Sequence, residues 1–205
     1  MARDITNPDF AEPGIGAAQK QKLFTGKNRD GIPGWEVIQD AVQLVALPPG
    51  ARPAGTAGSQ ALRLKGEEPG QAGAVSQTVR TTPGRRTTIS WMESPDLSGG
   101  SERIAGEQEY TVVVRPVDTA RGPGLKKEVF APAETAGAGW CRRSVEFVPA
   151  GVNVTVEFSA SPRGGRAALI TGLTLSAGAG RPAPPPEAFG TVTGGPAKPS
   201  RVPSS

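Results

Sequence analysis

The chain has 205 residues, of which 36% are hydrophobic and 5% aromatic, and its 23 basic and 19 acidic residues give a formal net charge of +4. This length suits one large domain with tails, and the 28 glycines and 21 prolines favour turn-rich β-structure over helices. The chain has no histidine and one cysteine, which excludes an internal disulfide, a multi-cysteine zinc site and histidine-based acid–base catalysis.

The start of the chain, MARDITNPDF, contains no apolar signal core, and no apolar run reaches the length that crosses a membrane. We therefore expect neither an ordinary export signal nor a membrane partner. The basic residues are scattered, whereas nucleic-acid binders usually gather them in a stripe with interleaved aromatics. We expect no nucleic-acid partner either.

Short runs of alternating apolar and polar residues, separated by glycine and proline, predict about ten strands. In chain order, the runs are residues 4–10, 35–38, 41–47, 60–64, 74–81, 86–91, 110–115, 129–130, 140–148, 151–159 and 167–176. A polar loop is expected after the first run, a hairpin is expected from the second and third, and the turn at Pro83 and Gly84 is expected to set the register of the strands around it. No amphipathic helix interrupts the runs, so the pattern predicts an all-β, antiparallel β-sandwich.

The alternation assigns side chains to the two faces of each predicted strand. The inward set is Leu62, Leu64, Val75, Val79, Ile89, Trp91, Val152, Val154, Val156 and Phe158. Arg63, Arg80, Thr88 and Glu157 point the other way, and we expect them on one exposed, polar sheet face. That face is either ordinary solvated surface or the place where a ligand binds.

Two groups of reactive residues are expected to be structural. Cys141 follows Trp140 in an apolar run, which favours a small buried side chain over a reactive thiol. Five acids in or beside one polar segment are expected to be solvated: Glu93, Asp96, Glu102, Glu107 and Glu109. Because no serine has a histidine partner and no phosphate-binding glycine loop is present, we expect no enzymatic activity.

The composition changes at residue 178, where the alternating pattern gives way to proline and glycine. We predict a folded domain over residues 1–177 and an extended, polyproline-like tail over residues 178–205. Phe189 and Val192 are the tail residues that would anchor it to a partner. A tail that docks nowhere is the alternative.

Several short phrases occur in an order that resembles the galactose-binding-like jelly rolls, and within them domain-of-unknown-function family 642. The phrases are residues 7–11 (NPDFA), 32–37 (IPGWEV), 58–64 (GSQALRL), 75–78 (VSQT), 81–84 (TTPG), 140–147 and 168–175. The resemblance covers roughly residues 5–176. It implies a jelly-roll sandwich from a superfamily used mainly for non-catalytic binding, often of carbohydrate.

The chain departs from the family pattern at positions that often help such jelly rolls to hold a structural calcium ion. Ala11 stands where the family has glutamate, with Glu12 one place later, and Thr171 and Gly172 stand where many relatives carry an acid. Calcium needs several oxygen ligands, so Asp9 and Glu12 alone would make a poor cage. We expect no cofactor, with these two residues as the calcium candidates.

Two functions suit these features. The first is a non-catalytic binding or adhesion module for polysaccharide or a cell-surface glycan, with Trp35, Arg63, Arg80, Thr88 and Glu157 as candidate contacts. The second is a structural surface or joining component of a virus particle or other large assembly, in which the tail docks onto other subunits. If the family resemblance holds, the protein is expected outside the cell or at a particle surface.

Overall fold

The computed structural model describes residues 5–15, 19–26, 31–65, 71–96, 108–117, 125–132, 139–161 and 167–178. These residues form eleven strands: β1 (Gln21–Thr25), β2 (Glu36–Gln39), β3 (Ala41–Ala46), β4 (Gln60–Arg63), β5 (Ala74–Arg80), β6 (Thr87–Ser94), β7 (Tyr110–Pro116), β8 (Lys126–Phe130), β9 (Cys141–Phe147), β10 (Asn153–Ala160) and β11 (Leu169–Ala177). Within the described ranges there is no helix of the length and apolarity needed to cross a membrane.

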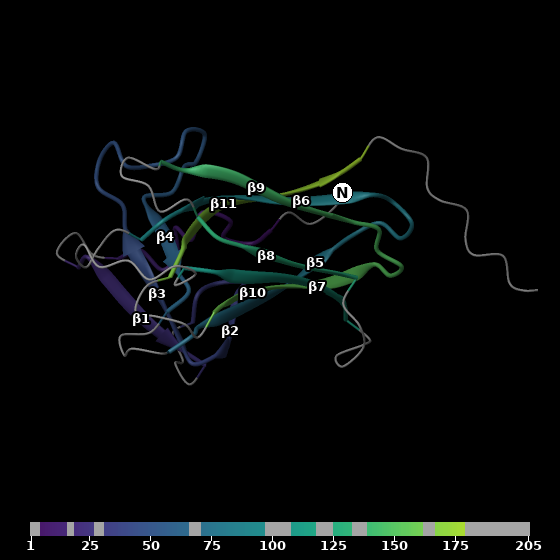
Figure 1. Ribbon diagram of the computed structural model, residues 1–205, viewed down its shortest axis with the longest axis horizontal. Coiled ribbons are helices and arrows are strands. Elements are labelled where there is room, and N and C mark those ends of the chain that lie inside the picture. The colour runs from purple at the N-terminus through teal and green to yellow at the C-terminus, as the bar shows by residue number, and fades with distance from the viewer. Residues whose placement is uncertain are drawn as a thin grey trace, which may run out of the picture.

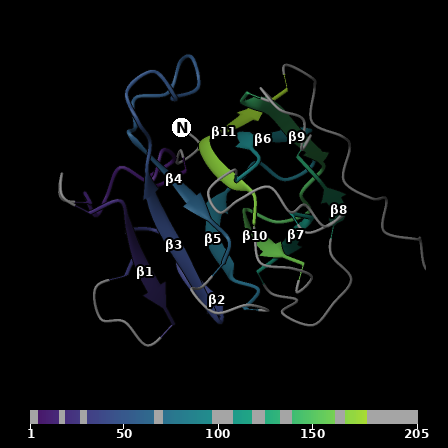
Figure 2. The same cartoon turned by 60° about the vertical axis from the view of Figure 1, so that its left-hand side comes forward.

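The strands form two antiparallel sheets that face each other, as predicted, in a jelly-roll β-sandwich (Figure 1). The six-stranded sheet has the order β1-β3-β4-β11-β6-β9, and the five-stranded sheet has the order β2-β5-β10-β7-β8. Figure 2 shows the first of these orders from β1 on the left to β9 on the right. In Figure 1, β1 and β3 cross β6 and β9 at a steep angle, so the six-stranded sheet is strongly twisted.

The core lies between the two sheets and is built from the inward positions of alternating strands. Trp91 is fully buried at its centre, where its ring centroid lies 5.2 Å from that of Phe158 and 5.0 Å from that of Phe130. All of the residues predicted to face inward are buried except Val152, which precedes β10 and is 51% exposed. Alternation therefore identified the core because side-chain direction in a strand is a local property.

The first strands differ from the prediction. Residues 5–10 form bends and a turn rather than a strand, although Ile5 and Phe10 are both buried in the core. The first strand among the described residues is β1, which lies in the segment expected to be a polar loop. This strand has too few apolar residues to show an alternating pattern. The predicted hairpin of β2 and β3 is also wrong, since β2 pairs with β5 and β3 pairs with β1 and β4 in the other sheet.

The turn at Pro83 and Gly84 does not join a β-hairpin. It carries the chain from β5 in one sheet to β6 in the other. The turn has one bond of its own, from the Arg85 amide to the Thr82 carbonyl at 3.1 Å. Two further bonds go to the segment before β10, where the Thr81 amide donates to the Val152 carbonyl at 2.8 Å and the Gly84 amide donates to the Pro149 carbonyl at 2.7 Å. The predicted register across this turn is therefore wrong, because β5 and β6 belong to different sheets and do not pair.

A polar network lies at the edge of the core between β6 and β9. Tyr110 accepts a hydrogen bond from the indole of Trp91 at 2.7 Å and donates one to Glu93 at 2.5 Å. The other carboxylate oxygen of Glu93 pairs with Arg143 at 2.7 Å. Burial, reinforced by the Glu93 hydrogen bond, raises the pKa of Tyr110 far above its ordinary value. The bond to Glu93 also raises the pKa of Arg143.

The structure corrects two expectations from the sequence. Glu93 has no exposed surface and Asp96 is 4% exposed, so neither acid is solvated, and each is held by an arginine. Cys141 was expected to be buried, but it is exposed at the start of β9. An acid can be buried when an arginine pairs with it. The spacing of residues along the chain does not show which acids have such a partner.

Candidate ligand-binding groove

The structure does not bring the predicted polar contacts together on one face. Arg63 and Thr88 lie on the outer face of the six-stranded sheet, whereas Arg80 and Glu157 lie on the outer face of the five-stranded sheet. The core separates the two pairs. Alternation tells an outward residue from an inward one, but it does not say to which sheet the strand belongs.

Two of the predicted contacts are buried. Trp35 is 6% exposed and packs against Phe10 and Phe158 at ring-centroid distances of 5.4 and 6.1 Å, so it is a core residue and offers no platform for a ligand. Arg63 is 9% exposed although it points away from the core. Thr88 is half-buried on the open sheet face, while Glu157 pairs with Arg115 at 3.5 Å.

A groove with a volume of about 740 Å³ lies on the outer face of the six-stranded sheet. It is lined by residues 19–21, 45–49, 51 and 94–96, and by Arg63, Trp140 and Leu169. The sheet supplies its floor, because Val45, Arg63, Leu169 and Ser94 are outward residues of four adjacent strands. We call this site the outer-face groove.

The floor of the outer-face groove holds a buried ion pair. Asp96 receives two contacts from Arg63, at 3.0 Å from Nη2 and 2.9 Å from Nε. Nη1 of Arg63 also donates to Gln21 at 3.1 Å and to Gln43 at 2.7 Å. Gln108 then holds the Asp96 amide with its side-chain oxygen at 2.6 Å. These bonds fix the polar groups of the floor before any ligand arrives.

One wall of the groove is the half-buried side chain of Trp140. Its indole N–H donates to the carbonyl of Ala51 at 2.6 Å, across 89 residues of chain. Ala51 ends a tight turn in which its amide donates to the Pro48 carbonyl at 3.0 Å and Gly50 has φ of 82°. Proline at the second position and a positive φ at the third define a type II turn. The turn therefore presents a fixed acceptor that orients the indole.

Replacing Gly50 with alanine is expected to lower the free energy of unfolding by about 1–2 kcal/mol, because a side chain is disfavoured at positive φ. A Cβ atom at Gly50 would meet nothing within 4 Å, so the loss would come from the backbone alone. Gly50→Asn should lose less, since asparagine tolerates this conformation. Gly31→Ala is the matched control, because Gly31 has equal space and no positive φ. Urea unfolding of the three variants measures the order, and equal losses for Gly50→Ala and Gly31→Ala would contradict it.

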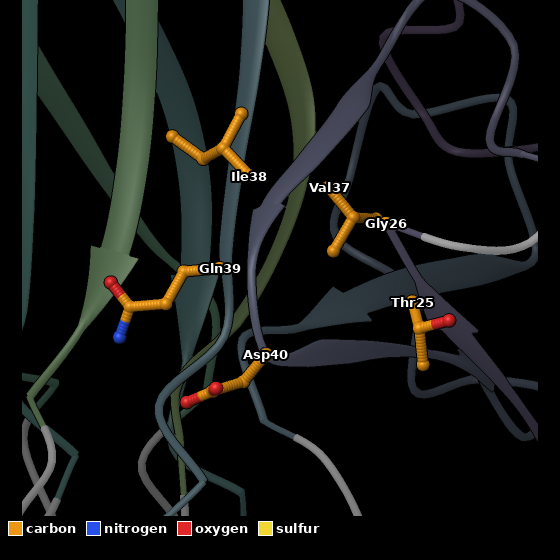
Figure 3. Close-up of a pocket in the computed structure, with 6 residues that line it drawn as sticks. All are labelled: Thr25, Gly26, Val37, Ile38, Gln39 and Asp40. Carbon is orange, nitrogen blue, oxygen red and sulfur yellow. The ribbon is translucent and has the colours of Figure 1, made fainter.

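A second, smaller hollow of about 410 Å³ lies between β1 and β2 at the side of the sandwich. Figure 3 shows Thr25 and Gly26 on one side of it and Ile38 and Gln39 on the other, with Asp40 below. Among the described residues that line this hollow there is no aromatic side chain, and Asp40 is the one with a charge. It lacks the combination of apolar wall and fixed polar floor that the outer-face groove has.

The calcium candidates do not come together as a cation site. The Asp9 carboxylate accepts a hydrogen bond from the Ala57 amide at 3.3 Å, and Glu12 is exposed with its amide bound to Asn7. Among the described residues, no three acids, cysteines or histidines are grouped as metal ligands would be. The donors present therefore do not fit a calcium ion, which needs several oxygen ligands. The tail anchors Phe189 and Val192 lie outside the described residues.

The two sheets and the groove on one outer face define the class of the protein, a jelly-roll β-sandwich with a ligand-sized groove. The chain belongs to the DUF642 family of proteins of unknown function, whose match covers residues 3–167. This confirms the resemblance inferred from the order of its sequence phrases. No curated protein sequence matches the chain.

Solved structures share the fold at low sequence identity. TmCBM61, solved in complex with β-1,4-galactotriose, has a TM-score of 0.50 and 15% identity over 84% of this chain and 97% of its own. The enzymatically active domain of tailspike protein 4 from bacteriophage CBA120 has a TM-score of 0.50 and 13% identity over 84% of this chain. This chain spans 21% of the tailspike chain. These likenesses establish the fold alone.

The residues that form the groove were mostly missed from the sequence. Trp140 was assigned to the start of a strand, Asp96 to a solvated segment, and Lys20 and Gln21 to a loop. A partial signal existed, since Trp140 is two residues before Arg142 and alternation places both on the outward face. No local signal shows that Pro48, Pro49 and Gly50 fold against that tryptophan.

Proposed function

We propose that this protein is a non-catalytic carbohydrate-binding module that holds a glycan in the outer-face groove. The observation that carries the proposal is the pairing of an aromatic wall, Trp140, with a floor of fixed polar groups around Arg63 and Asp96. Sugar rings present apolar faces and hydroxyl edges, and an aromatic wall beside fixed hydrogen-bonding groups matches both. The groove volume also falls within the usual range for small-ligand sites, about 300–1,000 Å³.

The rigidity of the groove supports this role. The floor is held by the Arg63–Asp96 ion pair and the wall by the turn of residues 48–51, so little side-chain freedom remains to be lost on binding. Preorganisation of this kind favours affinity because it lowers the entropic cost of association. The shared fold with TmCBM61, a galactotriose complex, is consistent with the proposal at the level of fold.

The state of the acids supports a binding role over a catalytic one. Glycoside hydrolysis usually needs two carboxyl groups that face the scissile bond. Asp96 is the one acid among the described lining residues, and both of its oxygens contact Arg63. Glu93 faces the core and is bound by Tyr110 and Arg143. Neither acid is placed to exchange a proton with a ligand in the groove.

The test is glycan-array binding by the intact chain, repeated on Trp140→Ala. We expect the wild type to bind at least one polysaccharide, and the variant to bind it about tenfold more weakly or worse, because the aromatic wall is lost. Arg80→Ala is the control, since Arg80 is exposed on the opposite sheet face. Absence of binding by the wild type, or equal losses in the two variants, would overturn the proposal.

The second interpretation, a joining component of a particle or other large assembly, depends on residues 178–205. Of these, only Gly178 lies within the described residues, where its carbonyl accepts a hydrogen bond from Arg85 at 2.7 Å. Gly178 follows β11 at the end opposite Leu169, which lines the groove. The other residues of this segment lie outside the described part of the chain, so the second function remains a prediction.

A further inference from the structure

We propose that the ligand of the outer-face groove is an anionic polysaccharide, one that carries carboxylate or sulfate groups. This inference rests on the proposed function and names the class of glycan. It is carried by the charges on the outer face of the six-stranded sheet, where the described acids have partners within the protein and several cations have no acidic partner among the described residues.

The acids that the structure describes on or near this face already have partners. Asp96 is bound by Arg63 through both oxygens, and Glu146 pairs with Arg86 at 2.5 Å. The nearby Asp9 carboxylate accepts a hydrogen bond from the Ala57 amide. Asp96 and Glu146 are each paired with an arginine and therefore offer little net repulsion to an anionic glycan.

Three cations around the groove have no acidic partner in the described part of the chain. Lys20 lines the groove and is exposed, and its backbone is fixed because its carbonyl accepts a hydrogen bond from the Ala46 amide at 2.9 Å. Arg52 is exposed and directly follows Ala51 in the wall. Arg142 is exposed two residues beyond Trp140 on the outward side of β9.

Arg142 is held in place by hydroxyl groups. Its Nη2 donates to Ser90 at 3.3 Å and to Thr174 at 3.5 Å, and these two hydroxyls bond each other at 2.8 Å. The guanidinium keeps its charge and further N–H donors for an incoming anion. Two residues along a strand span about 7 Å. A glycan stacked on Trp140 could therefore place an acidic group against Arg142 from a neighbouring sugar.

This spacing distinguishes a polymer from a single charged sugar. Lys20 and Arg142 lie on opposite edges of the six-stranded sheet, next to β1 and on β9, with the groove between them. A chain that crosses the groove would meet a cation on each side of the tryptophan. A ligand one sugar long would meet only one of them, so we expect affinity to rise with chain length.

The experiment compares charged and uncharged forms of the same polymers. Binding is measured for polygalacturonate and its fully methyl-esterified form, and for a sulfated galactan before and after desulfation. We expect the charged member of at least one pair to bind about tenfold tighter. Which pair shows the difference separates carboxylate from sulfate recognition. Affinity should also fall as salt rises from about 0.1 M to about 1 M, where the Debye length shortens from about 10 Å to about 3 Å.

Charge-removing variants locate the effect. Lys20→Gln and Arg142→Gln should each weaken binding of the charged polymer by about two- to fivefold, the usual effect of an exposed charge pair, and should weaken binding of the uncharged form by less. Lys127→Gln is the matched control, because Lys127 is exposed on the outer face of the five-stranded sheet.

Each contrary outcome has a definite meaning. If neutral polymers bind as tightly as charged ones and Trp140→Ala abolishes that binding, the proposed function stands and the anionic ligand is wrong. If Lys127→Gln weakens binding as much as Lys20→Gln, net charge rather than the groove attracts the polymer, and this inference is overturned. If no polymer of either kind binds while the glycan array shows binding of another, neutral polysaccharide, the inference is overturned and the proposed function stands; absence of binding on the array as well overturns both.

Discussion

Replacing Arg143 with methionine is expected to lower the free energy of unfolding by about 3–5 kcal/mol, the usual cost of removing one partner from a buried ion pair. The loss arises at Glu93, whose side chain has no exposed surface and would lose its cationic partner while the Tyr110 hydroxyl still donates to it. Removing Glu93 instead would leave the charge of Arg143, whose side chain is 35% exposed and therefore reaches water. The carboxylate cannot reach water because β6 directs it into the sandwich.

A matched control pair lies beside this one, because Arg86 directly precedes β6 and Glu146 is on β9. Arg86 and Glu146 also form an arginine–glutamate pair, but their side chains are 67% and 51% exposed. Arg86→Met should therefore cost less than about 1 kcal/mol. Urea unfolding followed by tryptophan fluorescence measures both. Adding Glu93→Gln to Arg143→Met should recover much of the loss, since it removes the buried charge and leaves an acceptor for Tyr110. An unchanged or larger loss in the double variant would contradict this account.

The second large effect is expected at the groove floor, where Asp96→Ala should also cost about 3–5 kcal/mol. It would leave the guanidinium of Arg63, whose side chain is 11% exposed, without its carboxylate partner. Glu157→Ala is the control, because the Arg115–Glu157 pair is longer at 3.5 Å and more exposed. That change should cost less than about 1 kcal/mol.

The coupling between Arg63 and Asp96 separates this explanation from a general effect of altering the floor. Arg63→Met and Asp96→Ala should be non-additive, with the double variant less damaged than the sum of the two by about 1–3 kcal/mol. Some loss should remain in the double variant, because Gln21 and Gln43 would each lose a donor. Additive losses would mean that the ion pair does not carry the stability of the floor.

The inward faces of the strands could be predicted from the sequence because they depend on local geometry. Alternation places Ile89 and Trp91 on one face of β6, and Val154 and Phe158 on one face of β10. This placement does not depend on the rest of the chain. The family resemblance added the jelly-roll type, which the two antiparallel sheets and the fold shared with TmCBM61 confirm. The missed strand, β1, has few apolar positions, so its place depends on pairing with β3 rather than on its own pattern.

The candidate site could not be predicted in the same way, because it is assembled from distant segments. Arg63 was correctly assigned to an outward position, yet Asp96, Gln21 and Gln43 cover it and turn an expected surface contact into part of the groove floor. Arg80 has the same outward pattern on another strand and lies on the opposite side of the molecule. Whether a strand residue points away from the core depends on local geometry. Whether distant segments then bury it depends on the tertiary structure.

The all-β sandwich, most of the side chains that fill its core and the family could all be predicted from the amino-acid sequence. Strand periodicity and turn residues act over a few positions, so a single chain carries that information. The assignment of strands to sheets came from the folded structure, and with it the placing of Lys20, Arg63, Asp96 and Trp140 around one groove. Those neighbours are set by pairing between strands far apart in the chain, for which alternation along one strand carries no signal.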